Sequence, residues 1–137
     1  QLEQALKKKI KNYADAFSGE DCGYIQSFPR TLNLAGWFVR LKKGGHQTEH
    51  LHPAGWLSGV FYLQAPKTSN PEEGAIELGL WGYDYPVLNN NYPKQRYYPE
   101  QGNLILFPSS LFHRTIPIHS TEDRLSIAFD LLPTETP

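Results

Sequence analysis

The chain has little of several features that commonly point to a function. Its 137 residues include one cysteine, Cys22, which excludes an internal disulfide framework and a zinc ribbon. A single thiol fits a reducing compartment, so we expect a cytoplasmic protein. No cysteine motif surrounds Cys22, and we interpret it as a packed thiol rather than a nucleophile.

Strong net charge and long apolar runs are also missing. The formal net charge is −1, so no basic field attracts nucleic acid or anionic lipid, and we expect neither as a partner. No apolar stretch reaches the roughly 18 residues that a membrane helix needs, and the first residues lack the apolar core of a signal peptide. Because Gln1 is not an initiator residue, we allow for a longer parent chain.

Helical periodicity is confined to the beginning of the chain. Apolar residues recur at helical spacing between Leu2 and Phe17, lysines occupy the other face, and Ser18-Gly19 follows. This pattern predicts one amphipathic helix over about residues 2–17.

Beyond the helix, short apolar runs alternate with turns rich in glycine and proline. They predict strands at 32–41, 47–51, 57–64, 74–81, 103–107, 112–116 and 124–131. Many short strands favour a β-sandwich or barrel with a covering helix. The length fits one domain over 1–137, with a β core over about 32–132.

The segment 81–101 is rich in aromatic and turn residues, and we predict a long loop there. Five of its six aromatic side chains would either line a substrate entrance or pack as an ordinary loop: Trp81, Tyr83, Tyr85, Tyr97 and Tyr98.

Histidine is concentrated just before the predicted strand 57–64. Three of the five histidines fall within the seven residues 46–52. On an extended chain, residues two apart point the same way, so His50 and His52 project together with their Cα atoms about 7 Å apart. Neutral imidazole is a good ligand for Fe, Zn, Cu and Ni.

A third ligand is expected from a distant strand. His113 follows an apolar strand and the turn Pro108-Ser109-Ser110, and a jelly roll would bring it to the same strand ends as the His-x-His pair. The alternative is that each histidine fills a hydrogen-bonded surface position. His46 and His119 lack such a pattern, and we interpret them as surface or supporting residues.

A charged residue occupies the polar face of the last predicted strand. Arg124 and Ser126 lie on the same side of this strand, and an arginine that points into a barrel needs an anion. A ligand carboxylate matches the guanidinium fork, with the Ser126 hydroxyl as a further donor. The alternative is an internal ion pair with Asp123, Asp130 or a glutamate.

With these residues in hand, the chain resembles the Fe(II)- and 2-oxoglutarate-dependent oxygenases, and most of all a bacterial and phage group of small, prolyl-hydroxylase-like members. The matching stretches are HLHPAGWLSGVFYLQAP, GNLILFPSSLFHRTIP and RLSIAFDL. Together with GWFVRLKKGGHQ they cover roughly residues 36–132 in the family's order. The resemblance implies a mainly β fold, a double-stranded β-helix (a cupin-like jelly roll), with the N-terminal helix packed on the sheet.

The resemblance also implies cofactors and roles for six side chains. Three would bind Fe(II): His50, His52 and His113. Three would bind the 5-carboxylate of 2-oxoglutarate: Arg124, Ser126 and Tyr62. The implied reaction uses O₂ and hydroxylates a small molecule or a peptide side chain.

One position departs from the family's widespread pattern, which is His-x-Asp/Glu followed by a distal His. His52 stands where the carboxylate would be. Glu49 has the wrong strand parity and Glu77 lies in a later predicted strand, so neither replaces it. A three-histidine site would carry one more unit of positive charge, which would shift its redox tuning and affinity.

Two other classes of protein stay open. Cupins also use His-x-His and a later histidine, but they usually add a glutamate a few residues on, where this chain reads Pro53-Ala54-Gly55-Trp56-Leu57. The absence of that glutamate, with Arg124-x-Ser126 present, favours the oxygenase. A metal-free interaction module of a larger protein is the third hypothesis.

Overall fold

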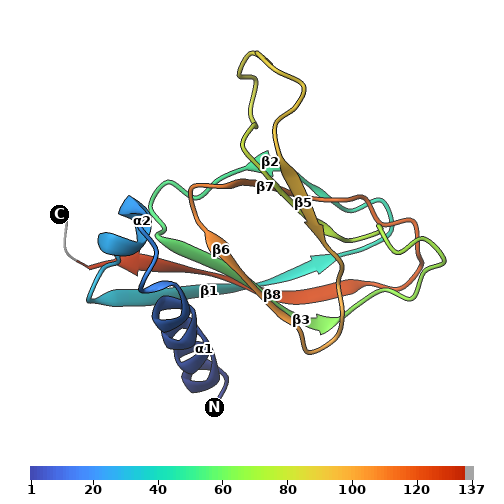
Figure 1. Ribbon diagram of the computed structural model, residues 1–137. Coiled ribbons are helices and arrows are strands. Elements are labelled where there is room, and N and C mark those ends of the chain that lie inside the picture. Colours follow the sequence, from blue (N-terminus) through green and yellow to red (C-terminus); the bar gives the residue numbers. More distant parts are fainter. Residues whose placement is uncertain (135–137) are drawn as a thin grey trace.

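The computed structural model describes residues 1–134, and this part of the chain forms two α-helices and eight β-strands (Figure 1). The helices are α1 (Leu2–Phe17) and α2 (Gly23–Gln26). The strands are β1 (Leu32–Leu41), β2 (Gln47–His50), β3 (Leu57–Gln64), β4 (Ile76–Gly79), β5 (Lys94–Tyr97), β6 (Leu104–Pro108), β7 (Phe112–Thr115) and β8 (Arg124–Pro133).

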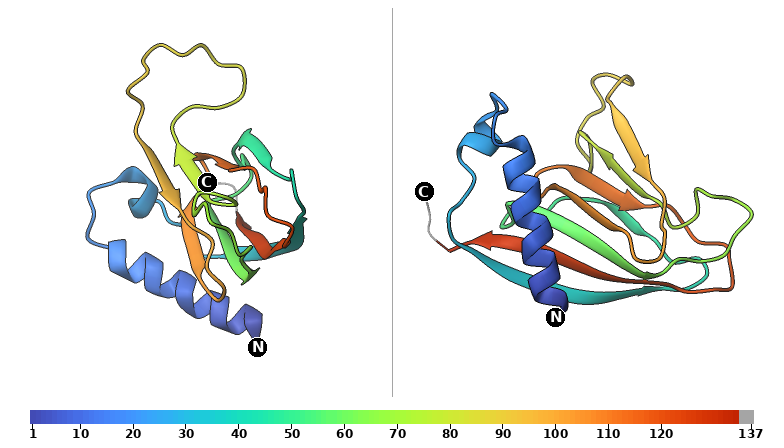
Figure 2. Two further views of the ribbon diagram at one scale, coloured as in Figure 1. Left: turned by 90° about the vertical axis from the view of Figure 1, so that its right-hand side faces the viewer. Right: turned by 60° about the horizontal axis from the view of Figure 1, so that its bottom comes forward.

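The strands form two antiparallel sheets of four. The major sheet has the order β1-β8-β3-β6 and the minor sheet the order β2-β7-β4-β5. Along the chain, successive strands alternate between the sheets except at β4 and β5, so the chain winds around a common interior (Figures 1 and 2). This arrangement is the double-stranded β-helix, and the predicted fold class is confirmed.

Helix α1 lies across the outer face of the major sheet (Figure 2). Its buried residues Leu6 and Ile10 share one apolar cluster with Leu57, Phe129 and Leu131 of the sheet. Burial of each large apolar side chain contributes roughly 1.5–3 kcal/mol, which explains why the amphipathic pattern of residues 2–17 produces a docked helix.

A glycine on β3 permits the close packing of this layer. Gly59 is paired with Phe129 of β8, and a Cβ atom at Gly59 would lie 2.3 Å from the Phe129 ring. No side chain other than hydrogen fits there without displacing the ring. The tip of the Phe129 ring therefore occupies the space beside Gly59, in the cluster that includes α1.

The inner faces of the two sheets form a second apolar cluster. Val60, Tyr62 and Phe107 of the major sheet pack against Ile76 and Leu78 of the minor sheet. Since side chains alternate along a strand, the residues of β3 and β8 that do not face α1 face this interior.

The structure differs from the sequence-based expectations in three places. Helix α2 lies where no helix was predicted, because a single turn of four residues is too short to show a helical period. Strand β5 lies inside 81–101, which was predicted to be loop throughout. It is an edge strand that pairs with β4 through its backbone, and its sequence Lys-Gln-Arg-Tyr lacks the apolar alternation that marks a half-buried strand. Cys22, expected to be packed, is an exposed free thiol in the connection that precedes α2.

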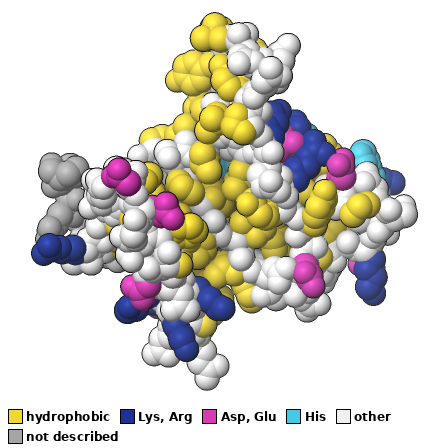
Figure 3. Space-filling model, viewed as in Figure 1, with side chains coloured by type: hydrophobic (Ala, Val, Ile, Leu, Met, Phe, Trp, Pro, Cys, Tyr) yellow, Lys and Arg dark blue, Asp and Glu magenta, His cyan; other side chains and the backbone are white. Residues whose placement is uncertain are grey.

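The remainder of the predicted loop projects from the two sheets between β4 and β5 (Figure 1). Hydrophobic side chains cover much of it, and basic and acidic side chains lie together below it (Figure 3). In the part of the chain that is described, neither helix has the length and apolar character needed to cross a membrane.

Candidate metal centre

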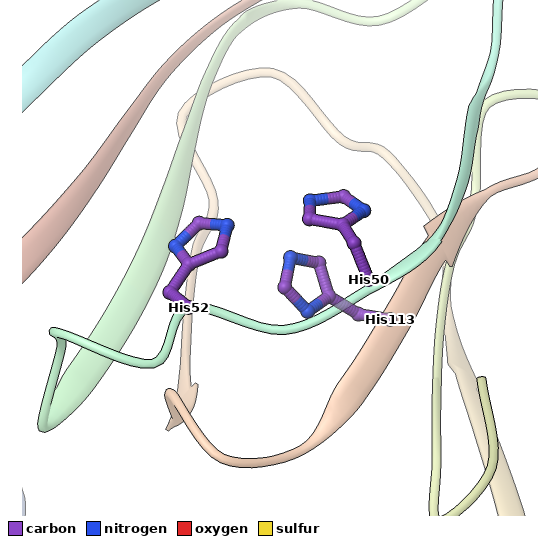
Figure 4. A group of neighbouring side chains, drawn as sticks. All are labelled: His50, His52 and His113. Carbon is purple, nitrogen blue, oxygen red and sulfur yellow. The ribbon is translucent and has the colours of Figure 1, made fainter. Parts of the chain in front are cut away.

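Three histidines meet between the two sheets (Figure 4). His50 ends β2, His52 lies just beyond it, and His113 belongs to β7. One potential ligand atom from each ring lies within 4.8 Å of those of the other two. Strands β2 and β7 pair in such a register that His50 lies opposite His113. The strand pairing thus brings the distal histidine to the His-x-His pair.

Hydrogen bonds orient two of these rings. The Nδ1 atom of His50 lies 2.7 Å from the carbonyl oxygen of Thr48, and the Nδ1 atom of His113 lies 3.1 Å from that of Leu111. A carbonyl oxygen only accepts hydrogen bonds, so each Nδ1 carries the hydrogen. Each Nε2 atom then keeps its lone pair for a metal ion.

The third ring is oriented by a carboxylate. The Nδ1 atom of His52 lies 2.6 Å and 2.8 Å from the two carboxylate oxygens of Asp130. Ser58 donates a hydrogen bond of 2.6 Å to the same carboxylate, and the Ser58 and Ser109 hydroxyl oxygens are 2.8 Å apart. His52 therefore presents its Nε2 atom in the same way as the other two histidines.

Burial keeps one of the rings neutral. His113 is 7% exposed, and burial lowers the pKa of its imidazole from the ordinary 6.5 to about 4. A metal ligand must be the neutral imidazole, so the fold holds His113 in the form that binds a metal at neutral pH.

No carboxylate in the described residues completes this cluster. Glu49 pairs with Arg114 at 3.1 Å, and Glu77 pairs with Arg114 at 2.9 Å and with Arg96 at 2.6 Å. Arg114 alternates with the inward-facing His113 on β7, so these ion pairs lie on the outer face of the minor sheet. The exposed side chains of His46 and His119 also lie outside the cluster.

A buried arginine lies in the same interior. Arg124 is 2% exposed, and its Nε atom donates to the carbonyl oxygen of Gly74 at 3.1 Å. Its two Nη atoms donate to the hydroxyls of Ser126 at 3.1 Å and Tyr62 at 3.4 Å. Both hydroxyls accept from the guanidinium, so their own hydrogens are free for another acceptor.

Within residues 1–134, the internal ion pair considered for this arginine does not form. Asp123 accepts a hydrogen bond of 2.6 Å from Arg40, and Asp130 is bonded to His52 and Ser58. No carboxylate within residues 1–134 forms an ion pair with Arg124. An unpaired buried guanidinium is costly, so this part of the interior suits an anionic ligand.

One cavity joins the three histidines, Arg124 and Ser126. Most of its other wall is apolar or neutral, from Val60, Ile76, Phe107 and Ala128 among others.

Trp37 also lines this cavity, and the sequence did not single it out. Trp37 is 41% exposed, and its ring centroid lies 5.8 Å from that of His52. The alternation of side chains along β1 could have indicated it. Trp37 points to the same face as Val39, which is another residue of the cavity wall.

The aromatic residues of the long loop do not line the cavity. Tyr83 and Tyr85 pack on Phe112, with ring centroids 5.2 Å and 6.4 Å from it. Phe112 alternates with His113 on β7 and so faces outward. For this pair the contacts are those of the packed-loop interpretation.

Comparisons with known proteins agree with this geometry. The model of the family described as "Putative 2OG-Fe(II) oxygenase" matches residues 35–130. A search of curated proteins finds no significant match.

Several solved structures share the fold. A prolyl-4-hydroxylase from Pseudomonas putida is 18% identical with a TM-score of 0.56, over 73% of this chain and 52% of that one. A 2OG-Fe(II) oxygenase family oxidoreductase from Burkholderia pseudomallei is 14% identical with a TM-score of 0.62, over 82% and 49%. HygX from Streptomyces hygroscopicus, solved with nickel and 2-oxoglutarate, is 20% identical with a TM-score of 0.56, over 75% and 58%.

At these identities the structures establish the fold alone, and the chain matches about half the length of the first two. The family model, in contrast, spans β1 to β8 and includes the three histidines and Arg124. The chain therefore belongs to the 2OG-Fe(II) oxygenase family that this model describes.

Proposed function

We propose that this chain is a non-haem Fe(II)- and 2-oxoglutarate-dependent dioxygenase that hydroxylates a small molecule or a peptide side chain. One observation carries the proposal. A single cavity holds three imidazoles with free Nε2 atoms and a buried guanidinium that lacks an anionic partner within the described chain. A metal ion and an anionic cosubstrate would satisfy both.

The three histidines would hold the iron. Neutral imidazole nitrogen suits Fe(II), and hydrogen bonds at Nδ1 of His50, His52 and His113 fix the three rings. Three protein ligands leave open positions for 2-oxoglutarate and O₂. When bound, iron and 2-oxoglutarate supply the oxidising chemistry, which converts 2-oxoglutarate and O₂ to succinate and CO₂ and inserts one oxygen atom into a substrate C–H bond.

Arg124 would hold the 5-carboxylate of 2-oxoglutarate. A guanidinium binds a carboxylate in a bidentate manner, and the bond to Gly74 fixes the direction of the fork. The free hydroxyl hydrogens of Ser126 and Tyr62 are additional donors. Burial raises the pKa of the Tyr62 phenol, so it stays protonated and able to donate.

The primary substrate would pass Trp37 on its way to the iron. No Asp, Glu or Lys side chain is among the residues that line the cavity in the described chain. This lining favours an uncharged reacting group that would pack on the exposed indole. The exposed thiol of Cys22 and the absence of a basic field fit an enzyme of the reducing cytoplasm that acts on neither nucleic acid nor membrane.

Anaerobic titration tests this function. Protein purified without chelator and loaded with Fe(II) is titrated with 2-oxoglutarate, and the weak visible charge-transfer band of a chelated 2-oxo acid is followed. We expect saturation at one equivalent. Metal binding without this band and without heat of binding would favour the cupin-type alternative, whose three-histidine centre needs no 2-oxoglutarate. Failure to bind any metal would contradict both.

A further inference from the structure

A carboxylate stands directly behind one of the three histidines. Asp130 contacts the Nδ1 atom of His52 with both oxygens, at 2.6 Å and 2.8 Å. Its side chain is 13% exposed, and its remaining hydrogen bond comes from Ser58. The iron would bind on the opposite side of the His52 ring, at Nε2.

This carboxylate has no permanent cation beside it. Within residues 1–134 it contacts no lysine or arginine, and His52 is its only ion-pairing partner. His52 is neutral when it binds a metal through Nε2. Arg124 lies six residues away on the same strand face, about 20 Å by strand rise, so it does not offset this charge. A largely buried carboxylate without a cation is costly.

We propose that Asp130 is the carboxylate of this metal centre and that it acts through His52 as a positioning residue. This inference rests on the proposed function. In the widespread His-x-Asp/Glu pattern the carboxylate binds the metal directly. Here His52 would take the ligand position, and Asp130 would supply the negative charge from the far side of the His52 ring.

The surrounding contacts favour this role over accidental proximity. The backbone N–H of His52 donates to the carbonyl oxygen of Ser109 at 3.0 Å, and the Ser109 hydroxyl is linked through Ser58 to Asp130. Main chain and ring of His52 are thus held by one network. The glycine at position 55 leaves room for this network, because a Cβ atom there would lie 2.6 Å from the Ser109 Oγ atom.

The expected consequence is tighter metal binding. A carboxylate that accepts the Nδ1 hydrogen fixes the ring and raises the basicity of Nε2, and loss of such a partner typically weakens metal binding about 10- to 100-fold. The bound metal in turn offsets the charge of Asp130. Asp130 therefore contributes to stability mainly in the metal-loaded protein.

The decisive variant is Asp130→Asn, which keeps the shape of the side chain and removes its charge. We expect the dissociation constants for Fe(II) and Co(II), measured by anaerobic calorimetry, to rise about 10- to 100-fold. The melting temperature of the metal-free protein should change little, because the Asn oxygen can still accept the hydrogen bonds of His52 and Ser58. A purely structural Asp130 would give the reverse: a lower melting temperature without metal and little change in affinity.

Two further variants sharpen the comparison. Asp123→Asn removes a carboxylate that pairs with Arg40 outside the cavity, and it should leave metal affinity unchanged. Ser58→Ala keeps the charge of Asp130. It should therefore weaken metal binding less than Asp130→Asn does.

The outcomes separate this inference from the proposed function. Unchanged metal affinity in Asp130→Asn, or a metal-free variant that fails to fold, would overturn the inference while the oxygenase proposal stands. A wild-type protein that binds no metal would overturn both.

Discussion

His50 and His113 lie directly opposite each other in the β2–β7 pair, with their ring centroids 4.2 Å apart. They belong to segments far apart in the chain, and the antiparallel register alone makes them neighbours. A bulge in β2 lies between Gln47 and His50, and bulges commonly re-aim a side chain near a functional site. The relative position of the His50 and His113 side chains is therefore set by the backbone pairing of β2 and β7.

Removal of any one of the three histidines should abolish stoichiometric Fe(II) binding. We expect this for His50→Ala, His52→Ala and His113→Ala, with the β-fold retained in each, because the three rings lie near strand ends and outside both apolar clusters. Metal analysis and circular dichroism measure the two properties. His46→Ala and His119→Ala are the controls and should bind iron normally. Full iron affinity in His52→Ala would show that the three-histidine assignment is wrong.

Arg124→Ala should weaken 2-oxoglutarate binding to the Fe(II) protein. A charge-assisted hydrogen bond contributes roughly 1.5–3 kcal/mol, which corresponds to a rise in the dissociation constant of about ten- to a hundred-fold. Arg124→Lys should recover only part of the loss, since a point charge does not reproduce the fork. Ser126→Ala and Tyr62→Phe should weaken 2-oxoglutarate binding less, each by about the free energy of one neutral hydrogen bond.

Arg40→Ala is the matched control for Arg124→Ala, because its guanidinium pairs with Asp123 and is half exposed. It should leave 2-oxoglutarate binding unchanged. Normal binding in Arg124→Ala would move the anion site elsewhere, and Arg114→Ala would be the next variant to titrate.

The stability of the metal-free protein should fall as the pH drops from about 6.5 to 4. Burial lowers the pKa of His113 from 6.5 to about 4 in the folded state, so in this window the unfolded chain binds the proton more readily than the folded one. The contribution of neutral His113 to the free energy of unfolding is complete above pH 6.5. It is lost as the pH falls to 4, and the loss is about 3 kcal/mol at most.

Urea unfolding at several pH values measures this effect, and His113→Gln isolates it from carboxylate titration. The slope of the free energy of unfolding against pH should be shallower in the variant. Parallel curves for the two proteins would mean that His113 is readily protonated in the fold.

Trp37→Ala should impair binding of the primary substrate and spare both cofactors. The indole is exposed beside His52 but contributes no ligand atom, and the guanidinium of Arg124 lies over the ring of Tyr62. We expect a raised KM in turnover, with the dissociation constants for Fe(II) and 2-oxoglutarate unchanged. Phe38→Ala alters the neighbouring exposed residue on the opposite face of β1, and a similar rise in KM there would argue against a specific platform at Trp37.

Local patterns in the sequence determined the elements and the choice of candidate residues. The 3.6-residue period of 2–17 specified α1, and the two-residue alternation of 124–131 placed Arg124 and Ser126 on one face. These inferences succeed because side-chain direction depends on a few neighbouring residues. The same parity argument excluded Glu49, which the structure places in an ion pair with Arg114.

Tertiary structure decided which of these residues meet and which charges remain unpaired. Asp130 and His52 are 78 residues apart, and no local pattern distinguishes a carboxylate that supports a histidine from one that pairs with Arg124. Likewise, β5 forms because its backbone completes the edge of the minor sheet and Arg96 reaches the buried Glu77, although its own sequence is polar. Pairing between distant strands depends on sheet register, and register is a property of the whole fold.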